Sequence, residues 1–426
     1  MRPAVPEASA ASASLPALAP LRIAIVGAGP AGLGLALLAA QRLPMAQVHL
    51  FDARPLDKDI SGDPRTLALS LGSVQLLQRL RAWNEGAAQS IQQVHVSQAP
   101  PTLRHPAFGE AGQPVVSIHA REQGVERLGA VLAYGQLVAP MQAAWLRHCE
   151  ASPDRAFTRF GQPVADIRAV DDEVEVDAGI AERFDLVVIA EGGVFAEQSR
   201  KSLSHDYQQN AWVGTVQLDP ASPPGVAYER FTRNGPLALL PLPPTPQQAR
   251  RAALVWCLPQ AEDEVATLTD AQRLTVLNQQ LPPGLPPLRG ISPLKCFPLG
   301  LNAERSLVEG RLVRIGNAAQ TLHPVAGQGL NLGLRDAYAL VDALVQAQAR
   351  SPGSALSEAV PQALRRVQWQ RSPDRWATIL TTDFLARSFS WRWPALPAMR
   401  GLGLAALQAL PPLKKALARQ MMFGRR

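Results

Sequence analysis

The stretch from Leu312 to Asp336 contains the residues best suited to bind an anionic or carbonyl oxygen. An apolar strand is expected to end just before Gly316 and Asn317, and a loop containing Pro324 leads into a helix. Glycines in the loop and in the first helical turn leave backbone N–H groups and a helix N-terminus directed at one place. The stretch lacks the Lys and Ser/Thr of a phosphate-binding loop, so nucleotide hydrolysis is not indicated. A Gly-rich connection that binds nothing is the alternative.

A second glycine cluster follows the apolar segment at residues 21–26. Gly27 permits a tight turn, Gly29 lets a pyrophosphate approach the backbone, and Gly32 lets a helix pack on the strand. Asp52 ends the next expected strand, where a carboxylate can accept ribose hydroxyls. Strand, glycine turn, helix and terminal acid together predict a dinucleotide-binding βαβ unit.

Two further side chains could take part in chemistry. Arg65 begins an otherwise apolar segment, where its guanidinium could hydrogen-bond a cofactor sugar or phosphate; a surface arginine paired with Asp63 is the alternative. His323 is an acid–base candidate because histidine titrates near neutrality. A hydrogen-bonding role beside Pro324 is the favoured interpretation, since no Ser-His-Asp or Cys-His pattern indicates a side-chain nucleophile.

Composition indicates a large globular protein with a basic tail. The chain has 426 residues, 47% of them apolar, which excludes general disorder and suggests about two or three domains. From residue 384 onward there are eight Lys or Arg and no acidic residue, more than the whole net charge of +7. Three isolated cysteines (Cys149, Cys257 and Cys296) argue against a zinc site or a disulfide framework and favour a reducing cytosol, and no metal site is expected. No apolar run reaches the ~18 residues of a membrane-spanning helix.

The elements that must position these residues alternate at first and then change character. The strand expected at 186–189 leads into Glu191 and repeats the strand-then-glycine arrangement. Short strands at 212–218, 227–231, 237–240 and 253–257 are separated by Pro- and Gly-rich turns, and the proline runs at 241–246 and 282–287 are expected to be loops. Such an inserted antiparallel sheet would form the far wall of a pocket. Helices are expected over 332–349 and 355–389.

Taken together, these pieces resemble the FAD-dependent aromatic hydroxylases, and among them the ubiquinone-biosynthesis monooxygenases of the UbiH/UbiF/VisC type. The resemblance runs from residue 21 to about residue 344 in the same order, and it leaves out the N-terminal arm and the basic tail. Its matching segments are Gly27-x-Gly29-x-x-Gly32 with Asp52, residues 63–70, residues 94–97, residues 228–231 with 235–241, and residues 316–336. One segment departs from the family pattern: its second Asp-Gly motif reads Glu191-Gly192 here.

The resemblance implies an α/β fold, with a Rossmann-like FAD-binding domain, an inserted antiparallel-sheet substrate domain and a helical C-terminal tail. It assigns residues 21–90, 125–206 and 300–350 to the FAD-binding domain, 91–124 and 207–299 to the substrate domain, and 351–426 to the helical basic region. Residues 1–20 are rich in Ala, Ser and Pro, and are expected to form a disordered arm.

The resemblance also implies FAD as cofactor. Reduced flavin would react with O₂ to give a flavin hydroperoxide that oxygenates an electron-rich phenol. The cofactor-binding residues it implies are Gly27, Gly29, Gly32, Asp52, Arg65, Gly316, Asn317, Ala326, Gly327, Gly329 and Asn331. Pro324, Gln328 and His323 would lie at the reacting centre, and Phe231, Leu240 and Pro241 are guesses for the substrate wall.

The substrate expected from the family is a prenylated phenol or quinone precursor in ubiquinone biosynthesis, with O₂ as co-substrate. NADPH, NADH and a redox protein remain open as electron donors. The amphipathic, cationic tail is expected to lie on the inner face of a membrane, as part of a cytoplasmic, peripherally attached protein, with partners in a biosynthetic complex. A helix packed on its own domain is the alternative; nucleic acid is not indicated. The competing functions are a catalytically weak scaffold subunit and a hydroxylase of a soluble phenol.

Overall fold

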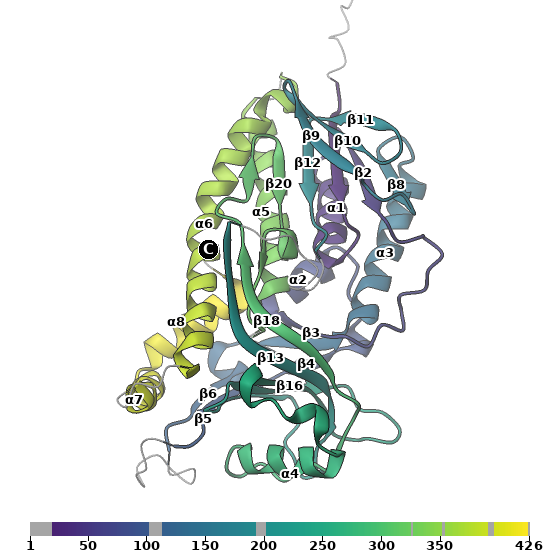
Figure 1. The fold of residues 1–426 in the computed structure, drawn as a ribbon. Helices are drawn as coiled ribbons and strands as arrows, with labels where there is room; N and C mark the ends of the chain where they lie inside the picture. Colours follow the sequence, from purple (N-terminus) through teal and green to yellow (C-terminus); the bar gives the residue numbers. More distant parts are fainter. Residues whose placement is uncertain are drawn as a thin grey trace, which may run out of the picture.

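The computed structural model describes residues 19–101, 113–192, 202–324, 327–351, 354–390 and 396–424. Most of the arm predicted for residues 1–20 therefore lies outside the described part. Figure 1 shows a parallel sheet with long helices in the upper half and a large sheet in the lower half.

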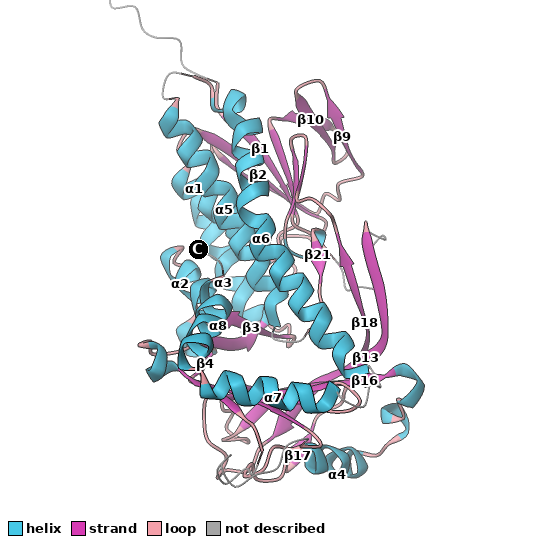
Figure 2. Ribbon diagram, turned by 90° about the vertical axis from the view of Figure 1, so that its left-hand side faces the viewer, coloured by secondary structure: helices cyan, strands magenta, loops and turns pink. Residues whose placement is uncertain are grey.

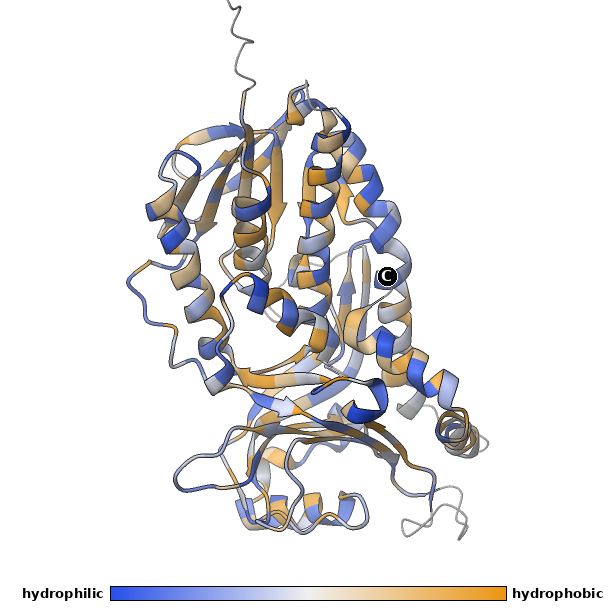
Figure 3. Cartoon of the chain, turned by 180° about the vertical axis from the view of Figure 1, so that it is seen from behind, coloured by the Kyte–Doolittle hydropathy of each residue, from blue (hydrophilic) through white to orange (hydrophobic). Residues whose placement is uncertain are grey.

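The upper sheet has the strand order β19-β20-β12-β1-β2-β8, in which β20, β12, β1, β2 and β8 run parallel. Parallel strands covered on both faces are almost continuously apolar. Figure 3 shows this character in the strands at the centre of the sheet, and β12 reads Leu-Val-Val-Ile. The bounds are β1 Leu21–Val26, β2 Ala46–Asp52, β8 Ala156–Phe160, β12 Leu186–Ile189, β19 Val308–Glu309 and β20 Leu312–Arg314.

A layer of helices covers one side of this sheet, and Figure 2 shows α1, α5 and α6 side by side. Helix α1 begins with Pro30, whose missing N–H is not needed at a first helical position. Gly34 and Gly333 allow α1 and α5 to approach closely, because a Cβ on Gly34 would lie 2.9 Å from the side chain of Leu334. The bounds are α1 Pro30–Arg42, α3 Tyr134–Ala151, α5 Gln328–Arg350 and α6 Leu356–Ser390.

The lower sheet follows the order β21-β18-β13-β16-β15-β14-β5-β6, with β17 paired to β13. All of its pairs are antiparallel except β14 with β5. The bounds are β5 Gln93–Gln98, β6 Val116–His119, β13 Leu203–Gln217, β14 Val226–Phe231, β15 Pro236–Leu242, β16 Arg251–Pro259, β17 Gly290–Ile291, β18 Lys295–Ala303 and β21 Gln320–Thr321.

Helix α4 (Asp270–Gln280) covers one face of the lower sheet. Thr269 caps its N-terminus through a reciprocal pair of hydrogen bonds with Gln272. Leu277 of this helix packs in one cluster with Leu254 and Trp256 of the sheet, all of them buried. This face is therefore a closed hydrophobic core.

Two smaller sheets complete the described fold. One has the order β11-β10-β9 and packs against the parallel sheet through a cluster that includes Phe184 and Val187. The other has the order β3-β7-β4 and lies, with helix α2, between the two main sheets. The bounds are β3 Thr66–Ser70, α2 Leu71–Arg79, β4 Gln89–Ile91, β7 Gly129–Ala133, β9 Asp166–Val170, β10 Glu173–Asp177 and β11 Ala181–Phe184.

The basic tail forms helices α7 (Leu396–Ala409) and α8 (Pro411–Phe423). On α8, Ala418 and Met422 are buried, and Lys414 pairs with Glu122 at 3.0 Å. Gln420 donates to the buried carboxylate of Asp374 in α6. One part of the tail is thus packed on the chain itself, as the alternative interpretation expected. Within the described residues, no helix combines the length and the hydropathy needed to span a membrane.

The predicted fold class is confirmed, and the expected strands at 212–218, 227–231, 237–240 and 253–257 are present. One local prediction was wrong: Pro241 lies in strand β15 and not in a loop. Strand β14 pairs with β15 only as far as Leu239, and Pro241 faces Ala252 of β16 on the other side. Beyond Leu239 that flank of β15 lies outside the β14 ladder, so the missing N–H of Pro241 breaks no bond to β14.

Candidate functional site

The turn between β1 and α1 has the geometry of a phosphate-binding turn. Gly27 has φ +105°, a backbone conformation that residues with a side chain rarely adopt, and a Cβ there would also lie only 2.6 Å from Glu191. A Cβ on Gly32 would lie 1.9 Å from the carbonyl oxygen of Gly27, which explains the close packing of helix on strand. Gly29 is the N-cap of α1, and nothing but the hydroxyl of Tyr134, at 3.8 Å, approaches its Cβ position.

Two carboxylates lie beside this turn. Asp52 ends β2, and its Oδ2 accepts a hydrogen bond from the backbone N–H of Ala28 at 2.6 Å. Its Oδ1 accepts from the N–H of Arg54 at 2.7 Å, so the side chain is held against the glycine turn. Burial, and then the charge of Asp52, raise the pKa of Glu191. Glu191 occupies the position at which the family pattern has Asp. Its backbone N–H lies against Gly27, so close that Gly27 cannot carry a Cβ.

The second glycine stretch comes to the same place in the folded chain. Gly316 has φ +59°, and its Cβ position lies 3.3 Å from Ala31 in the first turn of α1. A Cβ on Gly333 of α5 would lie 2.8 Å from the Cα of Gly316. A Cβ on Gly192 would lie 2.6 Å from Asn317. The β20–α5 connection and the β1–α1 turn thus form one continuous backbone surface, although about 290 residues separate them.

The loop into α5 is held by its own hydrogen bonds. The N–H of Gly327, the N-cap of α5 with φ +57°, donates to the carbonyl of Pro324 at 3.0 Å. Gln328 accepts a hydrogen bond from Arg335 at 3.2 Å, and no atom of the described residues lies within 4 Å of the Cβ position of Gly329. Val325 and the predicted cofactor-binding residue Ala326 lie outside the described residues.

Asn331 is buried, and its amide is fully used within the chain. Its Oδ1 accepts from the N–H of Ser70 at 2.8 Å and from the hydroxyl of Ser73 at 2.7 Å. Its Nδ2 donates to the carbonyls of Ala68 and Gly327. The side chain thus ties the first turn of α5 to β3 and α2, and it positions the loop rather than offering a free group.

His323 is buried, with 2% of its surface exposed. Its Nε2 lies 3.2 Å from Oε1 of Gln209, and its ring meets the edge of Tyr207 at 5.4 Å. Burial lowers the pKa of His323 to about 4, so the imidazole is neutral at pH 7. This environment fits the hydrogen-bonding interpretation better than a proton-transfer role.

Arg65 pairs with Asp63 at 2.7 Å, the alternative considered for it, and its guanidinium lies 4.1 Å from the ring centre of Tyr134. Its side chain is 60% exposed. Tyr134 also lies near Gly29, so Arg65 is linked to the β1–α1 turn through the ring of Tyr134.

The lower sheet presents its second face to this loop region. On this face Ala227, Phe231, Ala253 and Cys257 are buried by neighbouring elements, whereas the alternate residues between them in the same strands keep part of their surface accessible. Cross-strand pairing places the following residues in adjacent rows of that face, which we call the accessible face: Val213, Ala238, Leu240, Val255 and Glu229.

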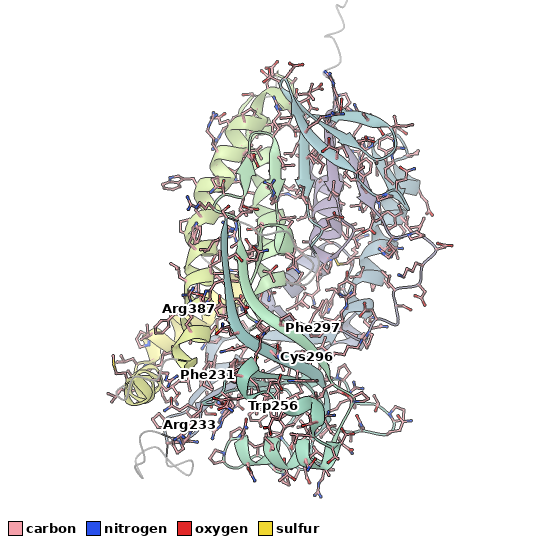
Figure 4. The ribbon with its side chains drawn as sticks, in the orientation of Figure 1. Phe231, Arg233, Trp256, Cys296, Phe297 and Arg387 are labelled. Atoms are coloured by element: carbon pink, nitrogen blue, oxygen red, sulfur yellow. The ribbon has the colours of Figure 1, made fainter. Side chains whose placement is uncertain are left out.

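Of the three guessed substrate residues, Phe231 and Leu240 share the accessible face by strand alternation. Pro241 alternates to the α4 side, together with Leu239. Figure 4 labels Phe231 and also Trp256, which belongs to the opposite, α4-covered face.

The loop and the accessible face border the same region. Leu322 packs in one cluster with Val213 and Val255. The Cβ position of Gly327 lies 3.3 Å from Ala68, and Ala68 packs with Leu240. A planar ligand bound by the glycine stretches would therefore have the accessible face opposite it.

The residues present fit FAD. The open position at Gly29 and an α1 N-terminus without a capping side chain or an acidic first turn suit a pyrophosphate. A Cβ on Gly29 would project into the space that such a group needs. The second glycine stretch is continuous with this turn, which suits an elongated dinucleotide.

Some residues at the site were not predicted. Tyr134 contacts both the Gly29 position and Arg65, and Ser70 and Ser73 hold Asn331. No local pattern marks them, because their partners lie far away in the chain. Glu229 lies within one of the matching family segments, and its signal in the sequence is that of a single acid in an apolar strand.

Comparisons with known proteins agree with this geometry. Residues 185–371 match the family model described as an FAD binding domain. The chain is 31% identical over 406 residues to the 3-demethoxyubiquinol 3-hydroxylase of Escherichia coli (strain K12), covering 93% of this chain and 97% of that protein. It is 31% identical over 419 residues to the ubiquinone hydroxylase UbiL of Rhodospirillum rubrum, and the match covers 94% of this chain and 89% of that protein. Klebsiella pneumoniae HpxO, solved with FAD and uric acid, shares the fold at TM-score 0.64 and 15% identity, covering 93% of this chain and 97% of that one.

Proposed function

The chain belongs to the FAD-dependent monooxygenases of the UbiH/UbiF/VisC type, and we propose that its substrate is a prenylated phenol or quinone precursor of ubiquinone. The observation that carries the proposal is the full-length similarity to two ubiquinone hydroxylases, which covers at least 93% of this chain. The similarity therefore includes both glycine stretches and the lower sheet, and not the cofactor-binding part alone.

FAD, when bound, supplies electron transfer and the activation of O₂. We propose that the backbone at Gly27, Gly29 and Gly32 holds its pyrophosphate, and that Asp52 faces its ribose. Gly316, Asn317 and the 324–329 loop would then border the flavin ring, where backbone N–H groups stabilise negative charge. In this assignment residues 21–90, 125–206 and 300–350 form the cofactor domain, and 91–124 with 207–299 form the substrate domain.

The accessible face supports an apolar aromatic substrate. Its side chains are aliphatic apart from Glu229, and Phe231 lies at the end of β14 beside them. Such a wall excludes water from the reacting ring and offers contact to a prenyl chain. The electron donor we propose is NADH, NADPH or a redox protein that binds transiently.

We also propose that the tail places the enzyme on an anionic membrane surface, where a prenylated substrate resides. Met399 and Leu402 of α7 and Leu413 of α8 are at least half exposed. Lys415 and Arg419 are exposed on the same α8 helix. Exposed apolar side chains together with cations are the features of a helix that lies at a lipid interface.

The experiment that tests the function is the profile of quinone intermediates in a strain that lacks the gene. A prenylated precursor missing one ring oxygen is expected to accumulate, and it should disappear when the gene is restored. Accumulation of no such precursor would contradict the proposal. Hydroxylation of a soluble phenol at equal efficiency, whatever the length of an added prenyl chain, would favour the soluble-phenol alternative.

A substitution in the β1–α1 glycine turn distinguishes a catalytic role of the protein from a purely scaffolding role. Gly29→Glu places a carboxylate where the pyrophosphate would bind, so FAD and rescue should both be lost. Gly86→Glu is the matched control, because Gly86 is exposed and only the side-chain oxygen of Asn84 comes within 4 Å of its Cβ position. Full rescue by a colourless, folded Gly29→Glu protein would support the scaffold.

A further inference from the structure

Glu229 is the one acidic side chain on the accessible face as defined above. It lies on β14 opposite Val96 of β5 and Ala238 of β15. By strand alternation it shares its side of the sheet with Ala227 and Phe231. The face that surrounds this carboxyl group is therefore apolar except for Gln98 of β5, which pairs with Phe231.

The carboxyl group is poorly satisfied within the described residues. Its Oε1 is buried and has no hydrogen-bond partner. The charged neighbour Arg230 points to the other face, where its Nε donates to the carbonyl of Gln280 at the end of α4. His95 of β5 also belongs to that face, where its ring meets Tyr228.

The titratable neighbour on the same face is Cys257 of β16. Burial and then the charge of Glu229 raise the pKa of the Cys257 thiol. Within the described chain no cation offsets the charge of Glu229, and burial raises its pKa to about 8.

Burying the Glu229 carboxyl group destabilises the folded protein, and the described contacts give it no structural role. A buried carboxyl without a full set of hydrogen bonds destabilises the fold, and an alanine or leucine at this place would avoid that loss. The arrangement makes sense if a ligand supplies the missing partner. The region opposite the sheet is bordered by Leu322 and Gly327 and, beside Phe231 and Cys257, by Leu385 and Ile379 of α6.

Resting on the proposed function, we propose that Glu229 binds the phenolic hydroxyl of the substrate and takes its proton while the ring is oxygenated. A phenol has one hydrogen-bond donor, and the orphaned oxygen needs one. The apolar residues around Glu229 would hold the ring, and the carboxyl would fix its orientation. This makes Glu229 a catalytic base and a selector for free phenols over their methyl ethers.

The proton transfer balances. The phenolic O–H bond breaks as an O–H bond forms on the Glu229 carboxylate, and the electron pair left on the phenolate oxygen spreads into the ring. After oxygen is added to an ortho or para carbon, that carbon loses its hydrogen to water as H⁺. The product phenolate then recovers the proton from Glu229, which becomes a carboxylate again. The oxygen atom comes from O₂ and the two electrons from the donor of the monooxygenase reaction.

The first test is the pH profile of kcat/KM, which reports the base of the free enzyme. A base must be ionised, so kcat/KM of the FAD-loaded enzyme should rise with pH and level off above about 8. Glu229→Gln keeps the shape of the side chain but cannot take a proton. It should lower kcat by about 100-fold or more and remove this rise.

The matched control is Tyr228→Phe, the preceding residue on the same strand, whose side chain lies in the core under α4. It should leave the pH profile unchanged. Both variants are checked for bound FAD by their visible spectra. If Glu229→Gln does not fold, the pH profile of kcat/KM is compared between the wild type and Glu229→Asp. The Asp variant retains a carboxylate base, so its profile should still rise with pH.

The second test measures binding without turnover. A short-chain prenylated phenol and its methyl ether are titrated into oxidised enzyme, and the ultraviolet band of the phenolate is followed. The wild type should bind the phenol at least tenfold more tightly and show the phenolate band at high pH. Glu229→Gln should lose the band, because its amide cannot take the proton, and should bind the phenol less tightly than the wild type does.

The outcomes separate the two proposals. If the wild type neither binds nor hydroxylates any prenylated phenol, the proposed function fails. If it hydroxylates the phenol while Glu229→Gln keeps the same pH profile and binds the phenol as tightly as the wild type does, the role of Glu229 is overturned.

Discussion

At the scale of single residues, the candidate site consists of glycines that have no room for a side chain and of polar side chains that are hydrogen-bonded within the protein. Gly27 and Gly32 leave no room for a Cβ, whereas Gly29 has room for one, and we propose that a pyrophosphate occupies that room. Asn331 and His323 are buried and engaged within the protein. Glu229 differs from them because its buried oxygen lacks a partner.

This difference predicts how stability depends on pH. Burial raises the pKa of Glu229 in the folded protein from 4.5 to about 8, so the folded state binds one proton more than the unfolded state between these values. Its contribution to stability is present below about pH 4.5 and is lost as the pH rises through 8. Urea unfolding of the wild type should show this fall.

In Glu229→Gln the pH dependence between 4.5 and 8 should flatten, because the side chain no longer titrates. Tyr228→Phe again serves as control and should keep the slope of the wild type. Parallel curves for the wild type and Glu229→Gln would contradict the raised pKa.

At the scale of elements, the contact between α1 and α5 brings the two glycine stretches together. Gly333 of α5, Gly316 before it and Ala31 of α1 meet with no space for a larger side chain. Each helix also begins at the site, so their N-termini converge on it. The spacing of these two helices therefore decides whether one dinucleotide can touch both stretches.

Gly333→Val should force these elements apart. The new Cβ would lie 2.8 Å from the Cα of Gly316, and overpacking of this kind costs about 1–3 kcal/mol. The purified variant should unfold at a lower urea concentration and retain less FAD through gel filtration. Gly403→Val, in α7, is the control: among the residues that the structure describes, nothing lies within 4 Å of its Cβ position, and the variant should retain FAD. Equal retention by both variants would show that the α1–α5 spacing is not critical.

At the scale of the whole molecule, the tail connects the surface to the site. Its inner side chains, Leu404 and Leu407 of α7 and Met422 of α8, pack on the sheets, while other apolar side chains remain exposed. Gln420 of α8 donates a hydrogen bond to Asp374, which pairs with Arg335, and Arg335 donates to Gln328, the first residue of α5. Deleting the tail would therefore disturb the fold as well as any surface binding.

Point substitutions avoid this problem. The double variant Leu402→Glu/Leu413→Glu should reduce sedimentation with phosphatidylglycerol vesicles by about tenfold or more, because each exposed leucine can bury apolar surface in lipid. Its thermal unfolding should match the wild type, since both side chains are exposed. Ile180→Glu, on the β10–β11 hairpin and 78% exposed, is the control that should leave vesicle binding intact. Unchanged binding by the double variant would contradict membrane attachment through the tail.

Much of this was available from the sequence, because the signals are local. The fold class, the glycine turn before Pro30 and the helix after the 324–329 loop follow from spacing and from backbone conformations that glycine permits. The similarity to the UbiH/UbiF/VisC type likewise rests on short ordered motifs. Local rules failed at Pro241, since the tolerance of a proline in a strand depends on which neighbour the strand has.

The tertiary structure alone decided which distant residues meet. It brought Gly316 against Ala31, engaged the amide of Asn331 with Ser70, and packed α8 on the chain although its charge suggested a surface helix. It also placed Glu229 and Phe231 on the accessible face and Pro241 on the other. The physical reason is that side-chain direction in a strand is set by register, and register is a pairing between segments that no single segment encodes.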